Sequence, residues 1–113
     1  MTIEINGRQL ETDNEGFLLD PAEWDTQVAE ALAETVQVRL SDEHWTVVNF
    51  IRNYFDDRQT VPEARHALKE LRDKLGKEKA TRRFLYSLFP YGYGQQACKI
   101  AGMRKPLKLM LDI

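Results

Sequence analysis

Cysteine and histidine are scarce in this chain of 113 residues, which holds one cysteine, Cys98, and two histidines, His44 and His66. A single cysteine excludes an internal disulfide and any zinc site built from several cysteines. Neither histidine has an acid or a cysteine at a recognised metal-ligand spacing, so the sequence predicts no metal and no other cofactor. We interpret His44 as a structural residue or a local capping residue in the first turn of a helix.

Long apolar runs are also missing. No run of about 18 apolar residues is present, which excludes a transmembrane helix. The amino-terminal residues contain no basic region followed by an apolar stretch, so we expect no secretory signal and a cytoplasmic protein. The length suits one domain, and we expect a hairpin and lead-in over 1–19, a helical core over 20–102 and a carboxy-terminal arm over 103–113.

Charges of the two signs are separated along the chain. Residues 1–57 contain 13 acidic and 3 basic residues, a balance of −10, whereas residues 58–113 contain 5 acidic and 13 basic residues, a balance of +8. Such asymmetry can create a basic face for an anionic partner. The alternative is that the two halves pack together and neutralise each other.

The amino terminus has the pattern of a β-hairpin. Residues 2–5 alternate in polarity, and Asn6-Gly7 is a strong signal for a two-residue hairpin turn. Residues 8–12 can return as the second strand. A second turn is expected at residues 13–16, followed by a short apolar segment, 17–19, that can lie against the core.

Helical spacing of apolar residues dominates from Asp20 onward. We expect the first helix to start there, with Asp20 as N-cap and Pro21 in the first turn, and its apolar stripe to reach Val36. Ser41 can cap the second helix. This helix has wide apolar faces, which predicts a position at the centre of the core.

Two further helices are expected in the basic half of the chain. The third opens with Thr60 as a cap and Pro62 in its first turn, and Gly76 ends it as a C-cap glycine. The fourth follows residues 77–80 and is stopped by Pro90. The chain is therefore expected to be mainly α, an α+β protein with an amino-terminal β-hairpin.

The last part of the chain is expected to contain one short helix and an extended tail. Residues 91–94 read as a loop, and residues 95–101 as a fifth helix closed by Gly102. Over residues 107–113 large aliphatic residues alternate with others, which favours a strand with one apolar face. We expect this tail to be pinned on its own domain or against a second chain, the second case giving a homodimer.

Eight short motifs follow one another in the order seen in a known family. They are NGRQ (6–9), DNEGFL (13–18), EHW (43–45), FIRNY (50–54), LGKEK (75–79), LYSLFPYG (85–92), QACKIAG (96–102) and KP (105–106). Through them the chain resembles the DsrC/TusE family, which comprises the gamma subunit of dissimilatory sulfite reductase and its sulfur-relay relatives.

The resemblance implies a fold and a chemistry. The fold is an amino-terminal hairpin, an orthogonal bundle of about five helices with a helix-turn-helix-like portion, and a carboxy-terminal arm. Family members pass sulfur as a cysteine persulfide, either to tRNA-thiolation enzymes or between sulfite reductase and a membrane complex. The partners implied are therefore proteins of a sulfite reductase or sulfurtransferase system.

The chain departs from the family in the arm, where the principal sulfur-bearing cysteine belongs. The family arm ends Lys-Pro-x-Gly-Cys-x, and its cysteine falls on Leu109, which has no nucleophile. Arg104 also replaces a proline common in the family arm. The resemblance thus predicts a sulfur-relay or sulfur-metabolism accessory protein that binds partners without the arm cysteine. Whether it is an enzyme stays open.

Cys98 matches a second cysteine that only part of the family has. A thiol reacts as its thiolate, which nearby positive charge and helix N-termini favour, so Cys98 is a candidate secondary thiol for a sulfurtransferase. The alternative is a small buried packing residue. The internal linkage between two cysteines that the family uses is impossible with one thiol.

Basic residues of the second half are candidates for binding a partner. They are Arg65, Lys69, Arg72, Lys77, Lys79, Arg82, Arg83, Lys99, Arg104 and Lys105. The first three share one face of the third helix. They could dock an acidic protein partner, or bind DNA if the chain is a regulator on the same scaffold. A solvated helix face is the plainer interpretation.

Overall fold

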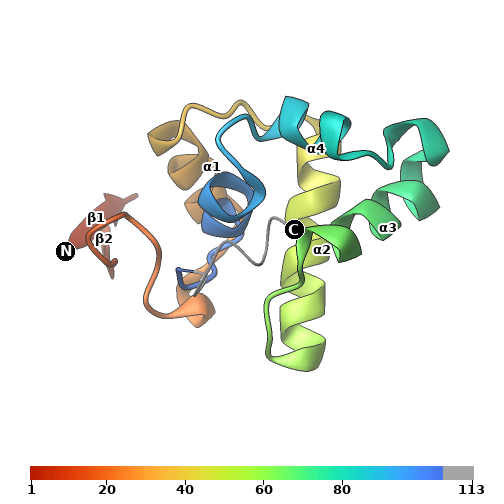
Figure 1. Cartoon of the computed structure of the whole chain (residues 1–113). Helices are drawn as coiled ribbons and strands as arrows, with labels where there is room; N and C mark the ends of the chain where they lie inside the picture. The colour runs from red at the N-terminus through yellow and green to blue at the C-terminus, as the bar shows by residue number, and fades with distance from the viewer. Residues whose placement is uncertain (106–113) are drawn as a thin grey trace.

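The computed structural model describes residues 1–105 (Figure 1). Its elements are β1 (Thr2–Ile5), β2 (Arg8–Glu11), the 3₁₀ turn η1 (Pro21–Glu23), α1 (Thr26–Thr35), α2 (Asp42–Arg58), α3 (Ala64–Leu75), the 3₁₀ turn η2 (Lys77–Lys79), α4 (Arg82–Leu88) and the π-helical η3 (Tyr93–Cys98). The expected mainly helical fold with a hairpin is confirmed. The tail expected over 107–113, with its pinning and its homodimer, lies outside the described residues.

The hairpin is held to α1 by its turn and by a small core of its own. Asn6 and Gly7 both have positive φ, 51° and 82°, as a tight two-residue turn requires. The Asn6 amide donates to Gln27 over 2.7 Å, and Arg8 pairs with Asp25 over 2.9 Å. The core beneath the hairpin consists of Ile5, Leu10, Leu18, Val28 and Leu32. Strand β2 ends one residue earlier than expected.

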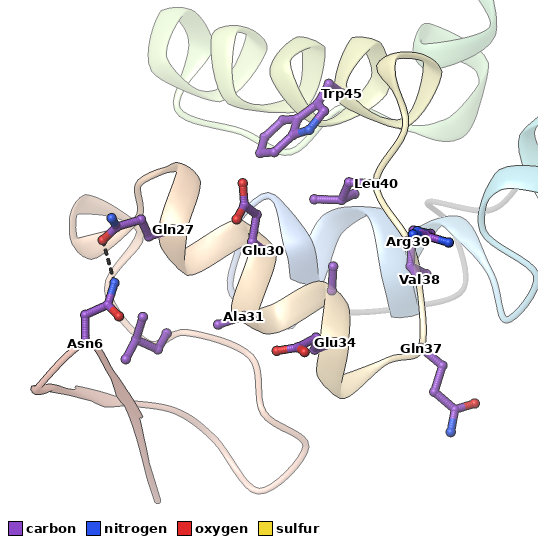
Figure 2. Close-up of a pocket in the computed structure, with 12 residues that line it drawn as sticks. Asn6, Gln27, Glu30, Ala31, Glu34, Gln37, Val38, Arg39, Leu40 and Trp45 are labelled. Carbon is purple, nitrogen blue, oxygen red and sulfur yellow. Dashed lines mark hydrogen bonds between the residues drawn. The ribbon is translucent and has the colours of Figure 1, made fainter.

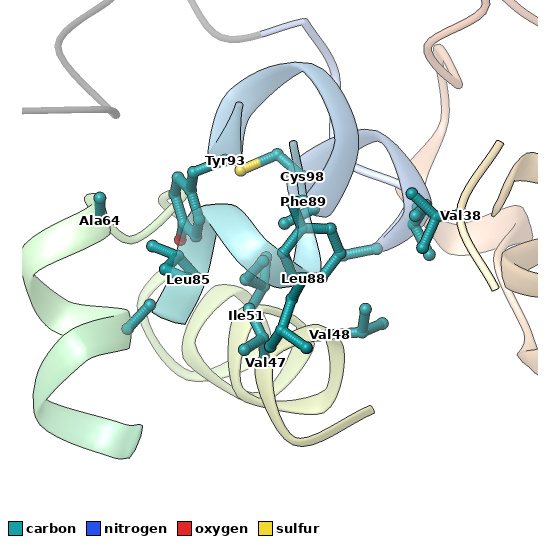
Figure 3. Packing of buried hydrophobic residues seen from close by; sticks show 14 of the residues in the cluster. Val38, Val47, Val48, Ile51, Ala64, Leu85, Leu88, Phe89, Tyr93 and Cys98 are labelled. Carbon is teal, nitrogen blue, oxygen red and sulfur yellow. The ribbon is translucent and has the colours of Figure 1, made fainter. Parts of the chain in front are cut away.

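The larger core surrounds α2, the long helix at the centre of Figure 1. Its buried face, Val47, Val48 and Ile51, packs with apolar residues of α3, α4 and η3 (Figure 3). The central position expected for this helix is therefore correct. Among residues 1–105 no helix is both long and apolar enough to cross a membrane.

The first predicted helix is wrong in one respect, because it is split. Asp20 caps only the turn η1, and the chain is extended at Trp24 before Asp25 caps α1. The Asp25 carboxylate accepts from the Val28 N–H over 2.9 Å, and this bond is the main cause that lowers the pKa of Asp25. The break lets the Trp24 indole donate to the carbonyl of Ile100, 76 residues away, over 2.7 Å.

The third helix starts later than predicted. Its first residue is Ala64 and its N-cap is Glu63, so Thr60 does not cap it. The backbone before the helix is engaged elsewhere, since the Pro62 carbonyl accepts from the Tyr93 hydroxyl over 2.7 Å. Gly76, with φ of 102°, ends the helix as expected.

The loop expected at 91–94 is also wrong in its second half. Tyr93 and Gly94 are buried and form the first turn of η3, so this helix begins two residues before the predicted one. The Gln96 side chain supports the turn by accepting from the Tyr91 N–H and donating to the Val36 carbonyl, each over 2.9 Å. A buried side-chain amide thus links the turn to the end of α1.

His44 joins two helices as well as capping one. Its Nδ1 accepts from the Ser41 N–H over 3.1 Å, and its Nε2 lies 2.8 Å from the Leu88 carbonyl at the end of α4. We expect His44→Ala to lower the free energy of unfolding by about 1–3 kcal/mol, because a cap is lost and a carbonyl loses its donor. Urea unfolding followed by circular dichroism measures this.

His66 supplies a matched control for that prediction. Its Nδ1 makes the equivalent bond to the Glu63 N–H over 3.0 Å, but within residues 1–105 it makes no hydrogen bond to another helix. His66→Ala should therefore cost less, about 1 kcal/mol. Equal losses for the two variants would show that the bond to Leu88 contributes nothing.

Candidate functional site

Cys98 lies at the end of η3 inside the larger core. Its exposed fraction is 0%, and its sulfur points into the cluster toward Tyr93 (Figure 3). A reagent cannot reach a side chain without exposed surface. The buried position agrees with the interpretation of Cys98 as a packing residue, and a reactive thiol at this position stays a prediction.

The carboxy-terminal arm leaves the core directly after Cys98 through a tight helix end. The Met103 N–H donates to the Cys98 carbonyl over 3.1 Å, and the Gly102 N–H donates to the Lys99 carbonyl over 2.9 Å. Gly102 has φ of 77°. This pair of bonds around a left-handed glycine is the Schellman motif, and the buried Met103 supplies its apolar contact.

Two side chains from distant elements hold this helix end in place. Trp24 packs against Gly102 and donates to the Ile100 carbonyl. Arg52 of α2 lies 4.7 Å from the centre of the Trp24 ring and donates to the Ala101 carbonyl over 3.2 Å. Burial lowers the pKa of the Arg52 guanidinium, while Asp56 raises it. We call Trp24, Arg52 and Gly102 the arm clamp.

Two of the candidate cations are held by the turn that follows the hairpin. Lys99 is only 9% exposed, donates to the Glu15 carbonyl over 2.6 Å and stacks on Phe17. Burial lowers the pKa of Lys99, and the Asp13 and Glu15 carboxylates raise it. Lys105 pairs with the Glu15 carboxylate, which raises the pKa of Lys105. These contacts fix the start of the arm against the amino-terminal half.

The remaining candidate cations lie on α3, η2, α4 and the arm root. All except Lys79 are exposed, namely Arg65, Lys69, Arg72, Lys77, Arg82, Arg83 and Arg104. Arg65 pairs with Glu63 over 2.9 Å, and Lys79 pairs with Glu43 of α2. Arg65, Lys69 and Arg72 share one face of α3. Of these three, Lys69 and Arg72 form no ion pair with any other residue of 1–105.

The arm clamp was missed by reasoning from sequence. Arg52 and Gly102 do lie in two of the motifs that carry the family resemblance, which was a signal for their importance, and Gly102 was expected to close the last helix. Trp24 lies in none of them. Its role depends on a contact with Ile100 that no local pattern announces.

Comparison with known sequences places the chain in a family. A family model described as "DsrC like protein" matches residues 4–110. The sulfurtransferase TusE of Pectobacterium atrosepticum is 42% identical over 106 residues, which cover 94% of this chain and 97% of that protein. The sulfurtransferase TusE of Escherichia coli (strain K12) is 43% identical over 104 residues, which cover 92% of this chain and 95% of that protein.

Solved structures agree with the sequence comparison. The oxidized gamma-subunit of the dissimilatory sulfite reductase (DsrC) from Archaeoglobus fulgidus superposes with a TM-score of 0.89 at 34% identity, covering 96% of this chain and 98% of that one. The NMR structure of DsrC from Allochromatium vinosum superposes with a TM-score of 0.84 at 43% identity, covering 95% of this chain and 96% of that one. The fold, the ordered motifs and the match across residues 4–110 agree, and the chain belongs to the family of DsrC-like proteins.

Proposed function

We propose that this protein is a cytoplasmic accessory protein of a sulfur-relay or sulfite reductase system that binds partners without carrying sulfur itself. Membership of the DsrC-like family supports the sulfur pathway. One observation carries the rest of the proposal: Cys98, the only cysteine of the sequence, is buried. The family resemblance places the arm cysteine at Leu109, which has no thiol. Sulfur transfer through Cys98 would require the core around η3 to open.

The exposed face of α3 is the surface we assign to a partner. Lys69 and Arg72 extend from it, and Lys77 and Arg83 continue the positive charge along η2 and α4. Such a surface suits an acidic patch on a protein of the same pathway, because charge complementarity speeds association and selects the partner.

Reversing the charge of this face should remove partner binding and leave the fold intact. In Lys69→Glu/Arg72→Glu we expect capture of sulfur-relay or sulfite reductase proteins from an extract of the native host to fall by at least tenfold. The melting temperature should stay within a few degrees, since exposed charges contribute little to stability. Quantitative mass spectrometry of the captured proteins measures the first effect.

The matched control changes the net charge equally at other exposed sites. Arg8→Glu/Lys74→Glu alters the exposed start of β2 and the side of α3 about half a turn away from Arg72, and neither residue lines another proposed docking surface. This control should capture the same partners as the native chain. Equal loss in both variants would reject the α3 face as the docking surface. Binding of duplex DNA that weakens steeply with salt and depends on Lys69 and Arg72 would instead support the regulatory alternative.

A further inference from the structure

A second surface, of opposite charge, lies over α1, which Figure 1 shows on the other side of α2 from α3. An open groove of about 780 Å³ lies over α1, between the tip of the hairpin and the start of α2 (Figure 2). The Asn6–Gln27 hydrogen bond closes its hairpin end, and Trp45 forms its α2 side. Asn6 and Trp45 belong to two of the family motifs, whereas Glu30, Ala31 and Leu40 of the groove lie in none of them.

The floor of the groove is apolar. Ala31 of α1, Leu40 of the connecting loop and Trp45 of α2 are half-buried, and Val38 beside them is buried. Leu40 and Trp45 pack on the edge of the larger core, whereas Ala31 packs on the smaller one. The groove therefore crosses the seam between the two cores and leaves apolar surface partly in contact with water.

Two glutamates form the acidic rim. Glu30 and Glu34 are exposed and lie one turn apart on α1, and Figure 2 shows the Glu30 carboxylate directed toward Trp45. Within residues 1–105 neither forms an ion pair. Arg39, the one cation that lines the groove, points away from them. The rim thus presents negative charge that this part of the chain does not neutralise.

We propose that this groove binds a basic amphipathic helix of a protein partner. Apolar residues of such a helix would cover Ala31, Leu40 and Trp45, as in other helix-in-groove complexes. Lysines or arginines spaced by four residues would meet Glu30 and Glu34, which have the same spacing on α1. A nucleic acid or an acidic segment is disfavoured because its charge has the sign of the rim.

This surface is independent of the one proposed on α3. The groove selects a basic partner, whereas Lys69 and Arg72 select an acidic one. A single molecule can therefore hold two different partners at once, which is the arrangement expected of an accessory protein without its own reactive thiol. Each surface can fail its test without affecting the other.

The test uses a synthetic probe of defined chemistry. The probe is a peptide of about fifteen residues with leucines at helical spacing and lysines elsewhere, titrated into ¹⁵N-labelled full-length protein and followed by NMR. We expect it to shift the amide signals of Glu30, Ala31, Glu34 and Leu40 and the indole signal of Trp45. A matched peptide with glutamate in place of lysine should shift none of them.

Charge reversal of the rim provides the decisive variant. Glu30→Lys/Glu34→Lys should weaken binding of the leucine–lysine peptide by about tenfold or more. Glu4→Lys/Glu11→Lys changes the net charge equally on exposed hairpin positions and should retain native affinity. Shifts centred elsewhere, equal binding of both peptides, or equal weakening in both variants would overturn the proposal. Circular dichroism of each variant confirms that the fold is kept.

Discussion

Gly102→Ala is expected to destabilise the protein more than the same substitution at Gly7, Gly16 or Gly76, because of these four glycines only Gly102 has atoms within 3.0 Å of an added Cβ. A Cβ atom at this position would lie 2.4 Å from Cδ1 and 2.9 Å from Cβ of Trp24. Trp24 cannot move away easily, because its indole bonds to Ile100 and lies against Arg52. Overpacking and the positive φ together should cost about 2–4 kcal/mol.

The measurement is thermal unfolding followed by circular dichroism, in which this loss corresponds to a melting temperature lower by roughly 8–30 °C. Gly7→Ala is the matched control, because Gly7 has a similar φ of 82° and no atom within 4 Å of the added Cβ. It should cost only the backbone strain, about 1–2 kcal/mol. Equal losses would show that contact with Trp24 does not constrain the arm root.

Leu109→Cys is expected to raise the number of sulfur atoms that the folded protein accepts from none to one. With inorganic polysulfide as donor, a thiolate attacks a terminal sulfur, the adjacent S–S bond breaks, and a shorter polysulfide leaves with the electron pair. The native chain should gain no sulfur, because Cys98 has no exposed surface. Leu109→Cys should gain one, as intact-mass spectrometry will show.

Two controls separate the positions in that experiment. Leu109→Cys/Cys98→Ser should still gain one sulfur, which assigns it to the arm. The native chain unfolded in guanidinium should become reactive at Cys98, which shows that burial alone protects the thiol. Sulfur on the folded native chain that disappears in Cys98→Ser would contradict the proposed function and make Cys98 the carrier.

Local signals predicted most of the secondary structure. Asn6-Gly7 marked the hairpin turn, Ser41 marked the start of α2, and Gly76 marked the end of α3, because each acts through bonds to residues a few positions away. The helical α+β fold and the family followed from patterns of the same kind. The absence of a nucleophile at Leu109 is likewise a fact of sequence alone.

Contacts between residues far apart in the chain determined the features that these local signals could not predict. The break at Trp24 exists because its indole bonds to Ile100, and Tyr93 enters η3 because its hydroxyl bonds to Pro62. Sequence left Cys98 open between a reactive thiol and a core residue, since lysines nearby in sequence suggested activation. Only packing shows that Cys98 is buried and that Lys99 is held at Glu15, because burial depends on elements that are far apart in the chain and adjacent in the fold.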